Sequence, residues 1–154
     1  MSRARRRLEE MDLTLPSPPA PAGAYRRAVE AAGLVFVAGQ LPLVDGRMIL
    51  QGVVGDGGLP VEEGREAARQ CALNALGVLA AEGYDLDRTR IVRMTGYVAS
   101  VDGFEGQAQV VDGASELMAD VLGESGVHAR VAVGVGSLPL GAPVELEVIA
   151  TGER

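Results

Sequence analysis

From Tyr25 onward, hydrophobic and polar residues follow patterns that divide the chain into strands and helices. Two strand-like runs, at about 25–31 and 34–39, are separated by a turn-prone glycine, and a short third run follows around 48–53. The stretch 90–101 alternates as a long strand does, and two closing strands are predicted within 128–150.

Two segments show helical spacing instead. The segment 61–82 places Ala68, Ala72, Ala75 and Leu79 on one stripe, and 106–122 carries a second amphipathic pattern. The order strands, helix, strand, helix, two strands predicts an α+β protein whose helices cover one face of a mixed sheet. Because the other face would be left bare and apolar, we expect further copies of the chain to cover it.

The first closing strand carries one charged residue in an otherwise apolar run. Val131 and Val133 alternate with Arg130, Ala132 and Gly134, so one face is bulky and the other combines an arginine with very small residues. An arginine in such a run must find an anion or keep water beside it. The small side chains around it leave room for a ligand.

The second closing strand returns with two glutamates, Glu145 and Glu147, on one face. A guanidinium can hold a planar carboxylate through two hydrogen bonds, and a nearby glutamate can transfer protons. The alternative is an internal ion pair between Arg130 and Glu145. The spacing alone favours the internal ion pair.

Composition narrows the class of protein. A chain of 154 residues, 47% hydrophobic, suits a single core, and 3% aromatic residues with 21 glycines predict a core of closely packed Ala, Val and Leu. The net charge of −7 opposes binding to nucleic acid phosphates, so we expect no nucleic acid partner. We predict an N-terminal arm at 1–22, mobile until it docks, followed by one domain at 23–154.

Cysteine and histidine counts argue against metal chemistry. Cys71 is the only cysteine and sits among alanines of the first helix, where we expect an inert core thiol. No CxxC pair or histidine cluster indicates a metal site. The charged beginning of the chain lacks the apolar segment of a secretory signal, and no run is long enough for a bilayer, so we predict a cytoplasmic protein without a membrane partner.

Two blocks of sequence carry a family resemblance: PAGAYRRAVEAAGLVFVAGQLPL in the first strands and HARVAVGVGSLPLGAPVELEVIA in the last two. Through them the chain resembles, from about Pro21 to Ala150, the Rid (YjgF/YER057c/UK114) family. The helix segment Val110–Ser115, VVDGAS, is most similar to a branch of uncertain function with the motif VV(N/D)GAS. The resemblance implies a chorismate-mutase-like fold with a mixed six-stranded sheet, a homotrimeric barrel, and last strands that flank the 90–101 strand.

The family resemblance also implies an activity, the hydrolysis of reactive enamines and imines such as 2-aminoacrylate to 2-oxo acids and ammonia. Matched position by position, Arg130 is the clamp for the substrate carboxylate and Glu145 orients or activates water. Tyr25 lines the cleft between subunits, and Gly39 and Ala132 present backbone groups to the ligand. No cofactor is required.

Several positions depart from the usual deaminase pattern. Ala38 stands where a serine is usual, Ala132 where a cysteine is common, and Ala108 where the second helix often carries an asparagine. Asp112, one turn further along that helix, either replaces a polar group or disfavours a carboxylate substrate. His128, the only histidine, shares the strand face of Arg130 and can influence the cleft through its proton equilibrium, or it is a strand-edge residue without a catalytic role.

Three functions from different classes therefore compete. The first is an enamine or imine deaminase that uses Arg130 and Glu145. The second is a binding protein that holds small carboxylates, such as 2-oxo acids, without turnover. The third is an endoribonuclease, a label often attached to the family, which ranks last because the chain is acidic and shows no general-base pair on a basic surface.

Overall fold

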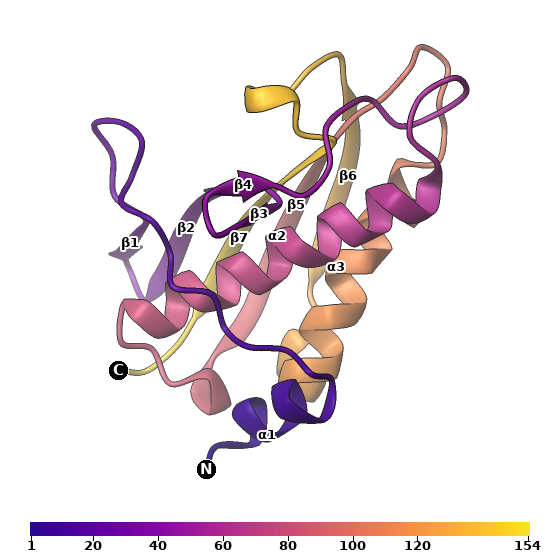
Figure 1. Ribbon diagram of the computed structural model, residues 1–154. Helices are drawn as coiled ribbons and strands as arrows, with labels where there is room; N and C mark the ends of the chain where they lie inside the picture. The colour runs from indigo at the N-terminus through magenta and orange to yellow at the C-terminus, as the bar shows by residue number, and fades with distance from the viewer.

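The computed structural model describes all 154 residues, which form one mixed sheet with helices packed against it (Figure 1). The strands of this sheet are β1 (Ala28–Ala31), β2 (Leu34–Gln40), β5 (Arg90–Ala99), β6 (Ala129–Val135) and β7 (Val144–Thr151). They lie in the order β1-β2-β7-β5-β6, and only β5 and β6 run parallel. The predicted α+β class is confirmed, and so is the placement of the last two strands on either side of β5.

Both long helices, α2 (Val61–Ala81) and α3 (Gln107–Leu122), lie across the same face of the sheet (Figure 1). The stripe predicted from the sequence is fully buried: Ala68, Ala72, Ala75 and Leu79. Small residues let the helices approach closely, because a Cβ atom at Gly113 of α3 would overlap the backbone oxygen of Arg65 on α2. This close approach fixes where the outer side chains of α3 stand relative to the sheet.

The opposite face of the sheet exposes large apolar side chains. Phe36 is 41% exposed, Val131 39% and Val133 38%, although they lie within regular strands. Exposed apolar residues gathered on one sheet face are typical of surfaces that another chain covers. The prediction that copies of this chain cover it stays a prediction.

The main sheet has five strands, so the prediction of six is wrong in this respect. The third predicted run, around 48–53, does not join it. Instead, β3 (Leu43–Val44) pairs with β4 (Arg47–Met48) as a separate two-stranded hairpin. Gly46 lies in the turn between β3 and β4, and Gly52 lies within the predicted run. Their φ angles of 77° and 130° lie outside the range of strand backbone, so the strand conformation is not continued there.

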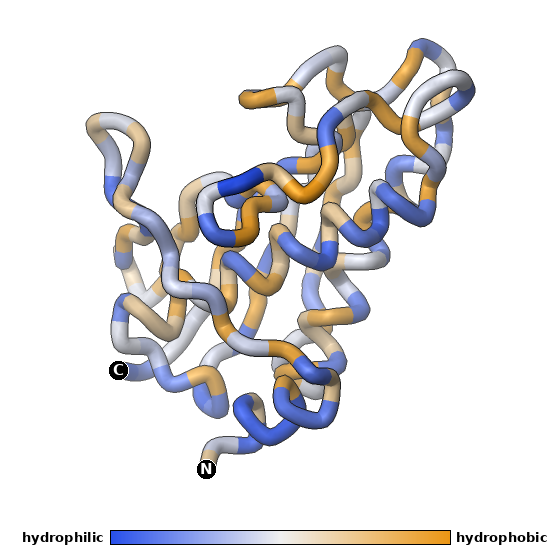
Figure 2. The backbone as a smooth tube through the Cα atoms, viewed as in Figure 1, coloured by the Kyte–Doolittle hydropathy of each residue, from blue (hydrophilic) through white to orange (hydrophobic).

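The N-terminal arm is docked in this structure. It begins with α1 (Arg3–Glu10), whose Ala4 and Leu8 are buried against the core, and continues to Pro16, which packs against Gly77 of α2. The hydropathy colouring of Figure 2 shows that α1 is hydrophilic over most of its length, in contrast to the strands behind the helices. That the arm moves before it docks, and that 23–154 form a separate domain, stay predictions.

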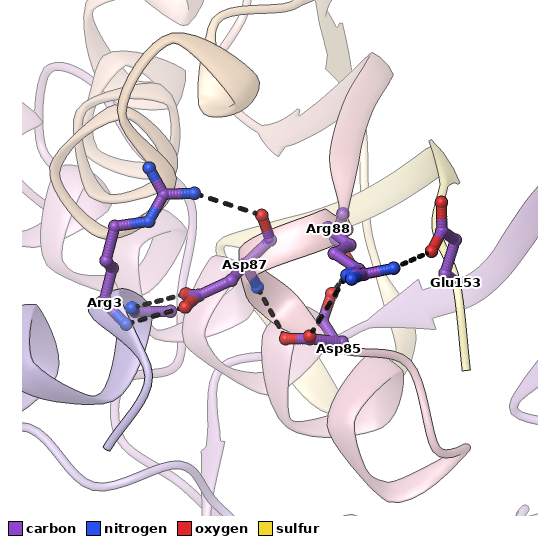
Figure 3. Close-up of polar contacts among 7 residues, drawn as sticks. Arg3, Asp85, Asp87, Arg88 and Glu153 are labelled. Carbon is purple, nitrogen blue, oxygen red and sulfur yellow. Dashed lines mark hydrogen bonds and ion pairs between the residues drawn. The ribbon is translucent and has the colours of Figure 1, made fainter.

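A polar network holds α1 in place (Figure 3). The carboxylate of Asp87 accepts the backbone N–H groups of Ala4 and Arg3, each at 2.8 Å, and the Ala4 bond in particular lowers the pKa of Asp87. Arg88, its neighbour, is paired with Glu153 near the end of the chain. Asp87 thus gives the first turn of α1 hydrogen-bond acceptors that the helix cannot supply itself.

Candidate functional site

Arg130 lies on β6, an edge strand of the sheet, and its side chain points toward α3. Its Nη1 donates to Oδ1 of Asp112 at 2.6 Å and to Oγ of Ser115 at 3.2 Å. Asp112 and Ser115 are three residues apart on the helix and therefore share one side of it. The side chain of Arg130 keeps 23% of its surface exposed and that of Asp112 43%, so solvent or a ligand reaches the pair.

A chain of hydrogen bonds continues from Ser115 to His128. Ser115 Oγ lies 3.0 Å from His128 Nε2, and His128 Nδ1 lies 2.6 Å from the carbonyl oxygen of Gly126. Since a carbonyl only accepts, Nδ1 carries the proton, and Nε2 of the neutral ring accepts the Ser115 hydroxyl. Burial lowers the pKa of His128, and the charge of Arg130 lowers it further, while the bond to Gly126 acts in the opposite direction.

Sequence reasoning did not assign a role to Ser115, although it belongs to the VVDGAS segment. The signal that could have found it is its spacing: the third residue after Asp112 lies on the same helix side. His128 and Arg130 were predicted to share a face, and both contact Ser115. The structure thus gathers Arg130, Asp112, Ser115 and His128 into one group, which we call the arginine cluster.

Glu145 lies on the other face of the sheet. In the strand register it is level with Tyr97 of β5, while its neighbours Val144 and Leu146 point into the core beneath the helices. Arg130 is level with the buried Met94, on the helix side. The internal ion pair between Arg130 and Glu145, considered from the sequence, is therefore wrong: alternation puts the two side chains on opposite faces, and Arg130 pairs with Asp112.

The carboxylate of Glu145 accepts no hydrogen bond and forms no ion pair within the chain. Its half-buried position raises its pKa above the ordinary glutamate value, and the charge of Glu147 raises it further. Oε1 of Glu145 lies directly over Gly39, since a Cβ atom built there would overlap it. A glycine on β2 thus provides the space in which this carboxylate stands.

Tyr25 and Gly39 border a common groove of about 520 Å³ between the N-terminal arm and the end of β2. The predicted positions Ala38 and Gly39 lie on one wall, and the prolines of the arm form another. Tyr25 is exposed at its rim. Gly39 therefore borders the groove and also contacts the carboxylate of Glu145. We call Tyr25, Gly39 and Glu145 the glutamate cluster. Arg130 does not line the groove.

The remaining predicted positions are placed as follows. Ala132 follows Arg130 on the helix-facing side of β6 and packs against the core, and Ala108 is exposed on the first turn of α3. Cys71 is fully buried, its thiol donates to the carbonyl of Val144 at 3.6 Å, and burial raises its pKa well above the usual value. The predicted core position of the thiol is confirmed, and its inertness stays a prediction.

Residues 16–152 match the sequence model described as Endoribonuclease L-PSP, and the chain belongs to this family. The protein TCP17 of Trypanosoma cruzi is 41% identical over 144 residues, which cover 92% of this chain and 89% of TCP17. The crystal structure of the protein Atu1372 with unknown function from Agrobacterium tumefaciens is 40% identical, with a TM-score of 0.88 over 97% of this chain and 92% of that one. The resemblance to the YjgF/YER057c/UK114 family is confirmed.

One relative is named for its location in the cell. The mitochondrial protein mmf1 of Schizosaccharomyces pombe is 33% identical over 132 residues, which cover 84% of this chain and 68% of mmf1. None of the helices combines the length and the apolar character needed to cross a bilayer. The cytoplasmic location stays a prediction.

Proposed function

We propose that this protein hydrolyses reactive enamines and imines of the 2-aminoacrylate type to 2-oxo acids and ammonia, in clefts between copies of the chain. The observation that carries the proposal is the division of Arg130 and Glu145 between two faces of one sheet. A small ligand that contacts both side chains must take them from two different copies. The exposed apolar face around Val131 and Val133 supplies a surface on which copies can associate, as the homotrimer implied by the family would require.

The chemistry follows from the two charged groups. The free N–H groups of Arg130 hold the substrate carboxylate, which fixes the reacting carbon near Glu145 of the neighbouring copy. Protonation of the enamine carbon gives an iminium, water adds to the carbon that bears nitrogen, and the resulting carbinolamine releases ammonia. For 2-aminoacrylate the balance is one water consumed and one pyruvate and one ammonia formed. The raised pKa of Glu145 suits a group that exchanges protons with water in this sequence.

The direct test is the hydrolysis of 2-aminoacrylate generated in situ from serine or cysteine by a lyase. We expect the wild-type protein to accelerate pyruvate and ammonia formation, and Arg130→Ala and Glu145→Ala to lose that acceleration. Size measurements on each variant establish that its assembly is unchanged. No acceleration by a correctly assembled wild-type protein would refute the proposed activity for this substrate class.

A binding function without turnover is the second candidate. It is favoured by the three alanines, Ala38, Ala108 and Ala132, that stand where the family often has polar side chains. Both functions predict that ligand binding depends on Arg130, but only the deaminase predicts ammonia release that depends on Glu145. Binding of 2-oxo acids by wild type together with no turnover of any imine would support the second candidate.

The family description favours endoribonuclease activity as a further candidate. The net charge of −7 opposes RNA binding, and both ring nitrogens of His128 are already hydrogen-bonded within the chain. We therefore expect no cleavage of RNA by carefully purified protein. Cleavage that disappears in Arg130→Ala would reverse this ranking.

A further inference from the structure

The arginine cluster contains a negative charge that a simple carboxylate clamp does not need. Asp112 lies 2.6 Å from Nη1 of Arg130 and is the more exposed member of the pair. A ligand that approaches Arg130 from solvent therefore meets a cation and an anion side by side. The charges of the pair compensate each other before any ligand binds.

The geometry of the pair leaves part of the guanidinium for a ligand. Asp112 and Ser115 both engage Nη1, while Nη2 and Nε form no hydrogen bond within the chain. Ser115 is held in turn by His128, so the orientation of the guanidinium is fixed from the helix side. A ligand carboxylate can therefore bind the free side of Arg130 without displacing Asp112.

A carboxylate bound there would experience repulsion from Asp112, because the two anions would share one guanidinium. The repulsion is removed when the ligand also carries a positive charge next to its carboxylate. The protonated form of a 2-imino acid has this arrangement, since its carboxylate and its iminium nitrogen are separated by two bonds. The corresponding 2-oxo acid product has the carboxylate but no cation.

We propose that Asp112 is a specificity-determining residue that binds the iminium nitrogen of the substrate while Arg130 binds its carboxylate, so that the site prefers zwitterions to 2-oxo acids. This inference rests on the proposed function and names its substrate class, the zwitterionic 2-iminio acids. Asp112 stabilises the protonated, electrophilic form of the substrate through a charge-assisted hydrogen bond. Hydrolysis replaces the iminium by a carbonyl, which removes this bond and favours release of the product.

Stable ligands allow the preference to be tested without turnover. The dissociation constants of alanine, a zwitterion, and pyruvate, an anion, are measured by calorimetry or ligand-observed NMR with wild type and Asp112→Asn. We expect wild type to prefer alanine, and the variant to shift the ratio of the two constants toward pyruvate about tenfold. Arg130→Ala loses both ligands. Asp120→Asn, on an exposed position of the same helix, makes the same change in net charge and should leave the ratio unchanged.

The outcomes separate the inference from the proposed function. A ratio that is the same in wild type and Asp112→Asn overturns the inference, and so does weaker pyruvate binding in the variant, which would mean that Asp112 only orients Arg130. Absence of binding of both ligands by wild type also overturns it. A shifted ratio combined with no imine hydrolysis would uphold the recognition of zwitterions and refute the deaminase activity.

Discussion

The arginine cluster and the glutamate cluster lie on opposite faces of one sheet and differ in how completely the chain satisfies them. Arg130 has an ion-pair partner and a hydroxyl beside it, and the hydroxyl is held by His128. Glu145 has neither a hydrogen bond nor an ion pair, and burial raises its pKa. One cluster is oriented in advance for binding, while the other keeps a carboxylate free for proton transfer.

This contrast shows how one small chain can meet two opposing chemical requirements. A group that binds a ligand gains from a fixed orientation, which reduces what is lost on binding. A group that moves protons needs a pKa nearer the working pH, which burial without a cation provides. Within a single copy the two groups stand on opposite faces, and the raised pKa of Glu145 comes from its burial and from Glu147.

Separating the copies is expected to have the largest effect. Val133→Asp places a charge on the exposed apolar face, so we expect a folded monomer without detectable deaminase activity, because each cleft needs both clusters. Light scattering after size exclusion and the ammonia assay measure the two consequences. Val44→Asp, on the separate hairpin, is the control and should retain assembly and activity. A fully active monomer would contradict the division of the site between copies.

Removing the proton-transfer group comes next. Glu145→Gln preserves shape but not basicity, so kcat should fall by about 10²–10⁴-fold while KM changes little. Steady-state kinetics with lyase-generated 2-aminoacrylate measure this separation. The melting temperature should not fall, because the variant no longer buries a charge without a partner. An unchanged kcat would exclude Glu145 from the reaction.

Displacing the same carboxylate should have a smaller effect. Gly39→Ala introduces a methyl group where Oε1 of Glu145 stands, and the flexible side chain moves away. We expect kcat to fall by about 100-fold, since misplacement of a reacting group by about 1 Å has such an effect. Gly136→Ala, where the added Cβ meets nothing within 4 Å, is the matched control. Equal activities of the two variants would mean that the position of Glu145 is unimportant.

Loosening the arginine cluster should weaken binding more than catalysis. Ser115→Ala removes an acceptor from Arg130 and a donor from His128, so KM should rise by roughly tenfold or less and the free energy of unfolding should fall by about 1 kcal/mol. The pKa of His128 should rise, because the hydroxyl that favours the neutral ring is lost, and NMR titration measures this change. Ser137→Ala in an exposed loop is the control. A fall in kcat alone would contradict a binding role for the cluster.

The smallest expected effect is a change in pH dependence. If the ionised Glu145 acts as the base, kcat/KM falls as the pH drops through its pKa, and burial and Glu147 place that fall above the ordinary glutamate range. Glu147→Gln removes the repulsion, lowers the pKa of Glu145 and moves the acid limb to lower pH. An acid limb that does not move would assign the profile to another group.

Local patterns predicted much of the fold. The periodicity of apolar residues predicted the alanine stripe of α2 and the alternation of β5, β6 and β7. It did so because every residue on the inner side of these elements packs against the same core. The third run around 48–53 was misassigned to the main sheet, since short apolar runs show no preference between joining a sheet and forming a separate hairpin. Apart from the residue type itself, nothing in the sequence pattern indicates that Gly46 and Gly52 adopt the positive φ angles seen in this segment.

Strand alternation was enough to predict which side chains share a strand face, and hence that Arg130 stands with Ala132 and that Glu145 stands with Glu147. It did so because the period of a strand is a local property of the backbone. The pairing of Arg130 with Asp112 instead of Glu145 could not be predicted in this way. That choice depends on which helix covers which face, and so on the packing of α2, α3 and the sheet, whose contacts join residues far apart in the chain.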